Sequence, residues 1–323
     1  MKVLVTGAAG FLGSHLTEKL VENGYDVRVL VHYDSNNNWG WLENSKYKKD
    51  IEFVVGDIRD FDSVYSALQN VDEVFHLAAL IGIPYSYLSP LAYIKTNIEG
   101  TYNVLQSAKL LKTKNILITS TSETYGSAQY IPIDENHPKV GQSPYSATKI
   151  GADSLAESFY RSFGLPIKIV RPFNIYGPRQ SARAIIPSIC IQILNGINQI
   201  KLGNTSTTRD LTFVKDTALG FIKISREETL NGESTNIGMN NEISIKNLVE
   251  KISSILNKKI NIITDQERVR PDKSEVTRLV CDNSKIKKFT DWDPEYNLDK
   301  GLRETIDWIE QNKTLFKHEI YNQ

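Results

Sequence analysis

Short apolar runs alternate with amphipathic stretches through the first half of this 323-residue chain. Such runs bounded by turn residues are typical of buried strands, and apolar residues spaced three and four apart are typical of helices. The alternation predicts an α/β fold, with a doubly wound parallel sheet that binds ligands at the carboxyl ends of its strands. The predicted strands are 2–6, 26–31, 52–55, 73–76, 115–119 and 167–171, and the predicted helices are 11–23, 60–70, 90–112 and 145–163.

The alternation loosens after Arg171-Pro172, where loops rich in Arg and Pro follow. We therefore expect a dinucleotide-binding domain of the Rossmann type at 1–172 and a smaller C-terminal substrate-binding lobe, mainly at 173–323. The chain shows no repeat and no detachable linker. For this reason we expect segments near 207–238 to interleave with the first domain.

Charge and cysteine usage narrow the class of protein. The 38 Lys and Arg balance the 38 Asp and Glu, so nothing predicts a nucleic-acid surface. Cys190 and Cys281 lie far apart without other metal ligands nearby, which argues against a disulfide framework or a metal site. The chain enters a strand at once and contains no long apolar run, so we expect a cytoplasmic protein without a membrane partner.

A glycine-rich turn lies between the first strand and the first helix. Gly7, Gly10 and Gly13 stand where backbone N–H groups and a helix N-terminus can hold a pyrophosphate. The alternative is that the glycines serve only tight packing. The predicted cofactor contacts of this turn are Gly7, Gly10, Phe11, Leu12 and Gly13.

Further cofactor contacts are predicted at the ends of later strands. Small residues at Leu77-Ala78-Ala79 would let a cofactor approach the backbone, although they also suit a buried strand end. Asp57, followed by Ile58, can accept from an adenine amino group or cap the next helix. Asn97 is a poor helix former inside a predicted helix, so we expect it to bind a water or a backbone group.

Catalytic chemistry is predicted around Tyr145 and Lys149, which share a helix face at i and i+4. A Lys cation beside a phenol favours the phenolate. Tyr296 and Lys300 have the same spacing in a charged tail, so the spacing alone does not show which pair is catalytic. A strand-like run followed by the turn 120–126, with its hydroxyls and carboxylate, favours the first pair.

Several longer motifs carry a family resemblance. They are NNNWGWL, AALIGIPYSY, STSETYGSAQYIPIDE, SPYSATKIGAD, RPFNIYGPRQSARAIIP and RPDKSEV, together with the G-x-x-G-x-x-G turn. Over nearly its whole length the chain resembles the extended short-chain dehydrogenase/reductases, in the branch of the nucleotide-sugar 4,6-dehydratases. It is most similar to the LegB-type N-acetylglucosamine 4,6-dehydratases of legionaminic acid biosynthesis.

The resemblance implies a reaction without net redox change on GDP- or UDP-N-acetylglucosamine. Carbon 4 is oxidised transiently, water leaves from carbon 6, and the hydride returns there, so NAD or NADP stays tightly bound and is regenerated each cycle. Tyr145 takes the proton of the carbon 4 hydroxyl, Thr121 binds that hydroxyl, and Lys149 lowers the Tyr145 pKa and holds the cofactor ribose. Glu123 removes the hydrogen of carbon 5.

One position departs from the common pattern. Many dehydratases have an Asp acid where this chain has Ser122, whereas GDP-mannose 4,6-dehydratases have Ser. The resemblance then implies that Glu123 itself carries the abstracted proton to the leaving hydroxyl. The alternative for Glu123 is a surface or helix-capping carboxylate.

Substrate contacts are implied in the later loops. Arg suits bidentate contact with a diphosphate, and family position points to Arg209 and Arg270. Asn174 would contact the first phosphate or the sugar. Tyr85 lines the sugar pocket or packs in the core, and Arg179 binds substrate or lies on a solvated face.

Cofactor identity stays open at this point. The second strand ends in Val31-His32-Tyr33, with Asp34 later than an NAD-selecting carboxylate usually stands. No Arg pair for a 2′-phosphate follows. His32 can bond either ribose, so both NAD and NADP remain possible.

Other activities and an assembly are also predicted. A UDP-glucuronate decarboxylase or a UDP-hexose 4-epimerase of the same family is the alternative, while a non-catalytic NAD(P)-binding regulatory protein is disfavoured by the intact Thr121, Tyr145 and Lys149. The helices at 90–112 and 145–163 carry more apolar surface than one sheet can cover. In this family they pair in a four-helix bundle, so we expect a homodimer.

Overall fold

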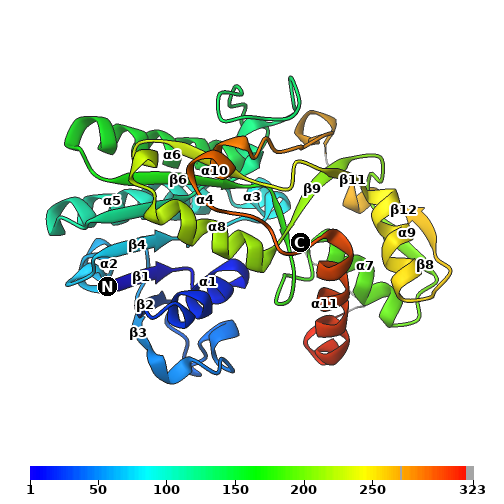
Figure 1. Cartoon of the computed structure of the whole chain (residues 1–323). Coiled ribbons are helices and arrows are strands. Elements are labelled where there is room, and N and C mark those ends of the chain that lie inside the picture. The colour runs from blue at the N-terminus through cyan, green and yellow to red at the C-terminus, as the bar shows by residue number, and fades with distance from the viewer. Residues whose placement is uncertain (270, 318–323) are drawn as a thin grey trace.

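A seven-stranded parallel sheet forms the centre of the larger lobe in the computed structural model, which describes residues 1–269 and 271–317 (Figure 1). Its strand order is β10-β6-β5-β4-β1-β2-β3, and every neighbouring pair is parallel. The predicted α/β fold with a doubly wound parallel sheet is confirmed. The strands are β1 (Lys2–Thr6), β2 (Asp26–Val31), β3 (Ile51–Val55), β4 (Glu73–His76), β5 (Asn115–Thr119), β6 (Ile167–Pro172) and β10 (Ser234–Ile237).

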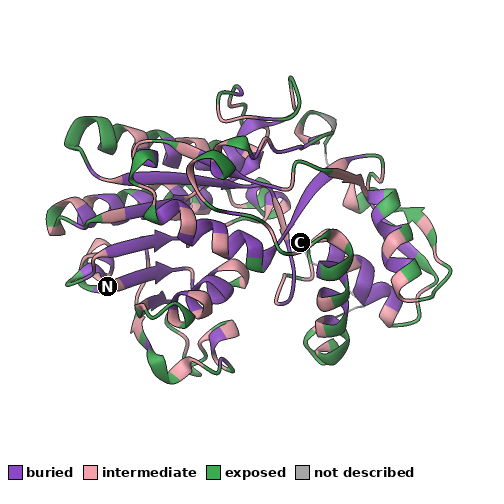
Figure 2. Cartoon of the chain, in the orientation of Figure 1, coloured by how far each residue is buried: buried purple, intermediate pink, exposed green. Residues whose placement is uncertain are grey.

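Helices cover both faces of this sheet, as the crossovers between parallel strands require. Figure 2 shows the central strands mostly buried and the helices exposed on their outer side, while the edge strand β3 has exposed residues. One apolar core joins α1 and α8 to the sheet, and a second joins α2, α5 and α6 to the other face. The helices are α1 (Phe11–Glu22), α2 (Phe61–Leu68), α5 (Gly100–Leu111), α6 (Pro144–Phe163) and α8 (Val214–Arg226).

The predicted helix at 90–112 is divided into three segments. A short α4 (Pro90–Tyr93) leads into a π-helical turn, Ile94–Glu99, before α5 begins at Gly100. Such turns insert an extra residue into a helix and are frequent at functional sites. Asn97 lies in this turn, where its side chain makes the backbone contacts described below.

After the first segments of the second lobe, the chain contributes one more helix and one more strand to the large sheet. Helix α8 packs on β5 and β6, and β10 then joins the edge of the sheet beside β6 (Figure 1). The preceding strand β9 (Thr208–Phe213) lies instead in a sheet of the second lobe. Within the segment near 207–238, α8 and β10 therefore contact the large sheet, whereas β9 does not pair with it.

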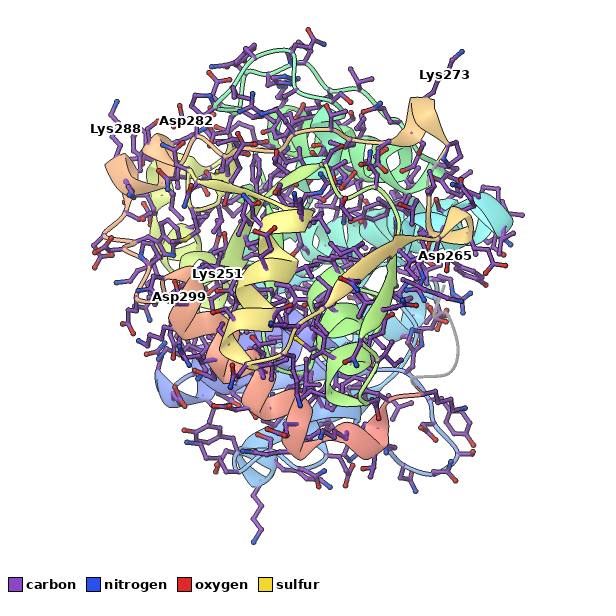
Figure 3. The ribbon with its side chains drawn as sticks, turned by 90° about the vertical axis from the view of Figure 1, so that its right-hand side faces the viewer. Lys251, Asp265, Lys273, Asp282, Lys288 and Asp299 are labelled. Atoms are coloured by element: carbon purple, nitrogen blue, oxygen red, sulfur yellow. The ribbon has the colours of Figure 1, made fainter. Side chains whose placement is uncertain are left out.

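The second lobe has its own core of aliphatic and aromatic side chains, among them Ile189, Phe213, Leu248 and Leu302. Figure 3 looks onto this lobe, where Lys251 of α9 pairs with Asp299 of α11 at 2.7 Å. Its three-stranded sheet is β11-β9-β7 and its two-stranded sheet is β12-β8. The remaining elements are α3 (Ile83–Leu88), β7 (Asn174–Tyr176), α7 (Ile185–Leu194), β8 (Gln199–Leu202), β11 (Glu242–Ser244), α9 (Ile245–Ile255), β12 (Asn261–Thr264), α10 (Ser284–Phe289) and α11 (Leu298–Gln311).

Within residues 1–269 and 271–317, no helix combines the length and the apolar character that crossing a membrane requires.

Candidate active site

A cavity of about 980 Å³ lies at the carboxyl ends of the large sheet, between the two lobes. One wall consists of the glycine turn after β1 and the segments that follow β4 and β5. The opposite wall comes from the second lobe and includes Asn174, Arg209 and Arg268. This is the position at which doubly wound sheets bind their ligands.

The glycine turn combines packing with an open helix end. Gly7 has φ +72°, and a Cβ there would stand 2.7 Å from the Ala78 nitrogen; a Cβ on Gly13 would collide with the Gly7 carbonyl oxygen. Tight packing therefore explains these two glycines. Gly10 is the N-cap residue of α1 and has no side chain to cap the helix, and Phe11, Leu12 and Gly13 line the cavity. Uncapped N–H groups at a helix N-terminus suit a diphosphate.

Other predicted cofactor residues also face the cavity. Asp57 accepts from Arg59 Nε with both carboxylate oxygens at 3.0 Å, and this bond holds the Asp57 pKa below its usual value. Asp60, not Asp57, caps α2, because its carboxylate accepts from the Ser63 N–H at 3.1 Å. The capping interpretation of Asp57 is thus wrong. The predicted cofactor residues that line this part of the cavity are His32, Asp57, Ile58, Leu77, Ala78 and Ala79.

Asn97 fastens the loop that follows β4. Its Oδ1 accepts from the Leu80 N–H at 2.9 Å, and its Nδ2 donates to the Leu80 carbonyl at 3.0 Å and to Thr148 Oγ1 at 3.0 Å. The prediction that Asn97 binds a backbone group is confirmed. The contact ties the π-helical turn and α6 to one wall of the cavity.

Tyr145 reaches the cavity from the first turn of α6, whose start is strongly defined. Pro144 occupies a first-turn position, and Ser143 and Ser146 form a capping box with bonds of 3.1 and 3.0 Å. The phenol is nearly buried, with 7% of its surface exposed. Thr121, Ser122 and Glu123 line the same cavity from the turn after β5.

The phenol is held in its protonated form by its surroundings. Burial raises the Tyr145 pKa above its ordinary value, a side-chain hydrogen bond with Thr121 opposes that effect, and the Glu123 carboxylate raises the pKa further. The predicted catalytic hydroxyl, carboxylate and phenol therefore interact electrostatically across the cavity.

Lys149 lies behind this wall and does not line the cavity. Its Nζ donates to the Thr119 carbonyl at 2.5 Å, and burial lowers its pKa to about 8, while Asp153 acts in the opposite direction. Lys149 is not among the main influences on the Tyr145 pKa. Burial is the largest influence on the Tyr145 pKa and the Lys149 ammonium is directed to a backbone carbonyl, so the expected effect of its charge on the phenol stays a prediction.

The second Tyr/Lys match has a different environment. Lys300 Nζ stands 4.0 Å from the centre of the Tyr296 ring, and that ring stacks on Phe213 in the core of the second lobe. The pair is a cation–π contact away from the cavity, so its spacing carries no catalytic meaning.

Two of the predicted substrate residues form part of the opposite wall. Arg209 is largely buried, donates to the Thr208 carbonyl at 2.8 Å and faces Glu275 at 3.5 Å. Asn174 Oδ1 is buried and makes no hydrogen bond within the described part of the chain. A buried acceptor without a partner at a cavity wall is suited to a ligand donor.

The remaining residues predicted to bind substrate differ in their position relative to the cavity. Tyr85 lines the cavity with 42% of its surface exposed, so it is not a core residue. Arg179 is absent from the lining and forms a bidentate pair with Glu18 of α1 at 3.0 Å, which corrects its assignment to substrate. Arg270 lies outside the described residues.

Arg268 was missed by the sequence reasoning. It lines the cavity, pairs with Asp265 at 3.2 Å and donates to Ser188 at 3.3 Å. The only signal in the sequence was its place two residues before Arg270.

Within the described residues, no group of three or more His, Cys, Asp or Glu could hold a metal ion.

Known proteins with similar sequences act on nucleotide sugars, according to their names. A family model described as GDP-mannose 4,6 dehydratase matches residues 4–305. A putative UDP-glucose 4-epimerase of Methanocaldococcus jannaschii is 31% identical over 96% of this chain and 99% of its own length. A UDP-N-acetyl-alpha-D-glucosaminuronate decarboxylase of Bacillus cytotoxicus is 32% identical over 96% and 98%.

A solved structure shows a similar fold. The dTDP-glucose 4,6-dehydratase DesIV of Streptomyces venezuelae, with NAD and TYD bound, has a TM-score of 0.87 and 28% identity over 98% of this chain and 99% of that one. These similar proteins are named for three different reactions. Similarity therefore defines a class of enzymes, and the choice among reactions depends on the residues of the site.

Proposed function

We propose that this chain, which belongs to the GDP-mannose 4,6 dehydratase family, is a nucleotide-sugar 4,6-dehydratase that acts on GDP- or UDP-N-acetylglucosamine. The observation that carries the proposal is Glu123, a carboxylate on the same cavity wall as Thr121 and close enough to Tyr145 to raise its pKa. A dehydratase needs a base for carbon 5 in addition to the group that serves carbon 4. The similarity of the longer motifs to LegB-type enzymes supports the choice of sugar.

The cavity has the features that a nicotinamide dinucleotide requires. The uncapped start of α1 at Gly10 to Gly13 would hold the diphosphate, and Asp57 with the small residues at Ala78 and Ala79 would receive the adenosine half. When bound, this cofactor accepts a hydride from carbon 4 and returns it to carbon 6. DesIV is described with NAD, which supports NAD here.

Each proton transfer is assigned to a residue of the chain. Tyr145 first loses its proton to solvent and, as the phenolate, takes the proton of the carbon 4 hydroxyl while Thr121 orients that hydroxyl. The resulting ketone acidifies the hydrogen at carbon 5, which Glu123 removes and passes to the departing carbon 6 hydroxyl to give water. Ser122 offers no acid of its own. A solvent proton finally reaches carbon 5 through Glu123, so protons balance.

A decarboxylase is the second candidate, because a curated relative carries that activity in its name. A 4-epimerase needs no base for carbon 5, so the cavity-facing Glu123 disfavours it. Arg183 also lines the cavity and offers a cation to a substrate carboxylate. This cation is the feature of the site that best fits the decarboxylase.

Product masses distinguish these activities. The protein is incubated separately with GDP-N-acetylglucosamine, UDP-N-acetylglucosamine and UDP-glucuronate, and the products are weighed by mass spectrometry. We expect loss of water from one N-acetylglucosamine nucleotide. Loss of carbon dioxide from UDP-glucuronate, or no change of mass with any substrate, would contradict the proposal.

A further inference from the structure

A buried polar network lies beneath the candidate site. Arg171, in β6, donates from Nε and Nη2 to Asp153 Oδ2 at 3.1 and 3.0 Å and from Nη1 to the Tyr125 hydroxyl at 3.0 Å. That hydroxyl donates in turn to Asn236 Oδ1 at 2.7 Å. We call Arg171, Asp153, Tyr125 and Asn236 the Arg171 network; none of its side chains lines the cavity.

The network joins the two segments that carry the proposed proton-transfer groups. Tyr125 ends the short 3-10 turn Ser122–Tyr125, which also contains Glu123. Asp153 belongs to α6, four positions after Lys149 on the helix that carries Tyr145 in its first turn. A single guanidinium therefore bonds both the turn of Glu123 and the helix of Tyr145.

The contacts are of a kind that fixes geometry. Arg171 and Asp153 are almost fully buried, and the planar guanidinium presents its donors in a rigid fork. The Tyr125 ring is enclosed by Phe173, at 6.4 Å between ring centres, and by Arg171, at 5.3 Å. The turn and the helix therefore have little freedom to move apart while these bonds persist.

Stability alone does not explain such a network. Removing two charges from water costs free energy that a buried ion pair regains only in part, and well-packed apolar residues often do as well. Ile169, two residues earlier on the same face of β6, is apolar and buried, so this environment accepts an apolar side chain. A charged pair at this position is instead explained if Arg171 and Asp153 fix the geometry of the candidate site, because their directional hydrogen bonds hold two segments in place.

We propose that Arg171 is a positioning residue, which sets the separation of Glu123 and Tyr145 by holding Tyr125 and Asp153 together. This inference rests on the proposed function, in which both groups transfer protons of one substrate. Proton transfer requires heavy atoms about 3 Å apart, and a misplacement of about 1 Å can cost about 10²-fold in rate. Arg171 is therefore expected to influence kcat without touching the substrate.

The test uses Tyr125→Phe, which removes the hydroxyl from the network and keeps the ring in its core. We expect kcat to fall by about 10-fold or more with KM changed less than about 2-fold, because binding contacts remain while alignment is lost. Tyr130→Phe is the matched control, since it removes an exposed hydroxyl bonded to Asp134 at 2.7 Å. The control should match the wild-type kcat.

A double-mutant cycle with Glu123→Gln separates positioning from general destabilisation. If Tyr125 acts through the position of Glu123, then Tyr125→Phe should change kcat less than about 2-fold when Glu123 is already Gln. An equal loss of kcat in both backgrounds, or an unchanged kcat in Tyr125→Phe itself, would overturn the inference. The cycle is measured on whichever nucleotide sugar the wild type consumes, and the product mass reports separately whether the reaction is a dehydration.

Discussion

At the scale of residues, Glu123 and Tyr145 reach one cavity from two differently fixed segments. The Ser143 and Ser146 capping box fixes the first turn of α6, and the Thr121 hydroxyl accepts from the Glu123 N–H at 3.2 Å. The carboxylate raises the pKa of the buried phenol, so their protonation states are linked. A change at Glu123 should therefore alter one proton transfer directly and ease deprotonation of Tyr145.

Glu123→Gln should separate the two halves of the proposed reaction. An amide cannot take the carbon 5 proton, so turnover should fall by about 10²- to 10⁴-fold while oxidation at carbon 4 continues. Reduced nicotinamide should accumulate and be visible by its absorbance. In deuterated water the wild-type product should carry deuterium at carbon 5, and the variant should show almost no exchange.

Glu157→Gln is a suitable control, because this α6 carboxylate pairs with Lys139 at 2.8 Å and does not line the cavity. It should behave as the wild type in both measurements. Normal product formation and normal exchange in Glu123→Gln would mean that another group is the base.

At the scale of elements, α5 and α6 leave apolar surface exposed. Leu110 and Phe163 each expose about half of their surface, and Tyr102 and Tyr160 expose more than a third. Tyr102 packs on Phe159, which in turn packs on Phe163, so these three rings follow the seam between the two helices. A contiguous apolar surface of this kind on a folded chain usually meets a partner.

We predict that α5 and α6 pair with their copies in a second chain to form a homodimer. Light scattering at micromolar concentration should give twice the mass of 36.5 kDa. A Leu110→Glu and Tyr102→Glu double variant should give the mass of one chain, because four charges would face each other across the two-fold axis. A wild-type monomer would refute the prediction.

At the scale of the whole molecule, α1 fastens the second lobe to the first. His15 Nε2 lies 3.0 Å from the Pro178 carbonyl oxygen, and Glu18 pairs with Arg179 one turn later. Burial lowers the pKa of His15 to about 4, so the imidazole is neutral at pH 7 and donates to that carbonyl. The junction of the lobes thus contains a titratable group.

His15→Gln should reduce the loss of stability in acid. The folded-state pKa lies below the unfolded value of about 6.5, so the contribution of neutral His15 is complete above pH ~6.5 and is lost as pH falls towards 4. Gln can donate the same hydrogen bond without titrating. Between these pH values the wild type should lose up to about 3 kcal/mol more of its free energy of unfolding than the variant.

Urea unfolding at pH 7, 5.5 and 4 measures this difference. Burial raises the pKa of Asp210 to about 6, which gives a slope of opposite sign above pH ~4, but Asp210 is present in both proteins and cancels. His32→Gln, at an exposed histidine, should follow the wild type. Identical losses of stability in wild type and His15→Gln would show that the pKa of His15 is the same in the folded and unfolded protein.

The sequence by itself determined six of the seven strands of the large sheet and many of the candidate site residues that line the cavity. Strand and helix periodicity depends on near neighbours, and Gly7, Gly10, Tyr145 and Lys149 stand at short, fixed spacings. Observed strand bounds such as Asp26–Val31 and Asn115–Thr119 match the predicted ones for this reason.

Only the tertiary structure decided which charges pair. Arg179 joins Glu18, and Arg171 joins Tyr125 and Asp153, across chain separations that no local pattern encodes. Lys149 bonds the Thr119 carbonyl because the packing of α6 on this face of the sheet brings its ammonium to the end of β5. The protonation of Tyr145 is likewise a tertiary property, since burial, rather than the neighbouring residue types, sets the pKa of its phenol.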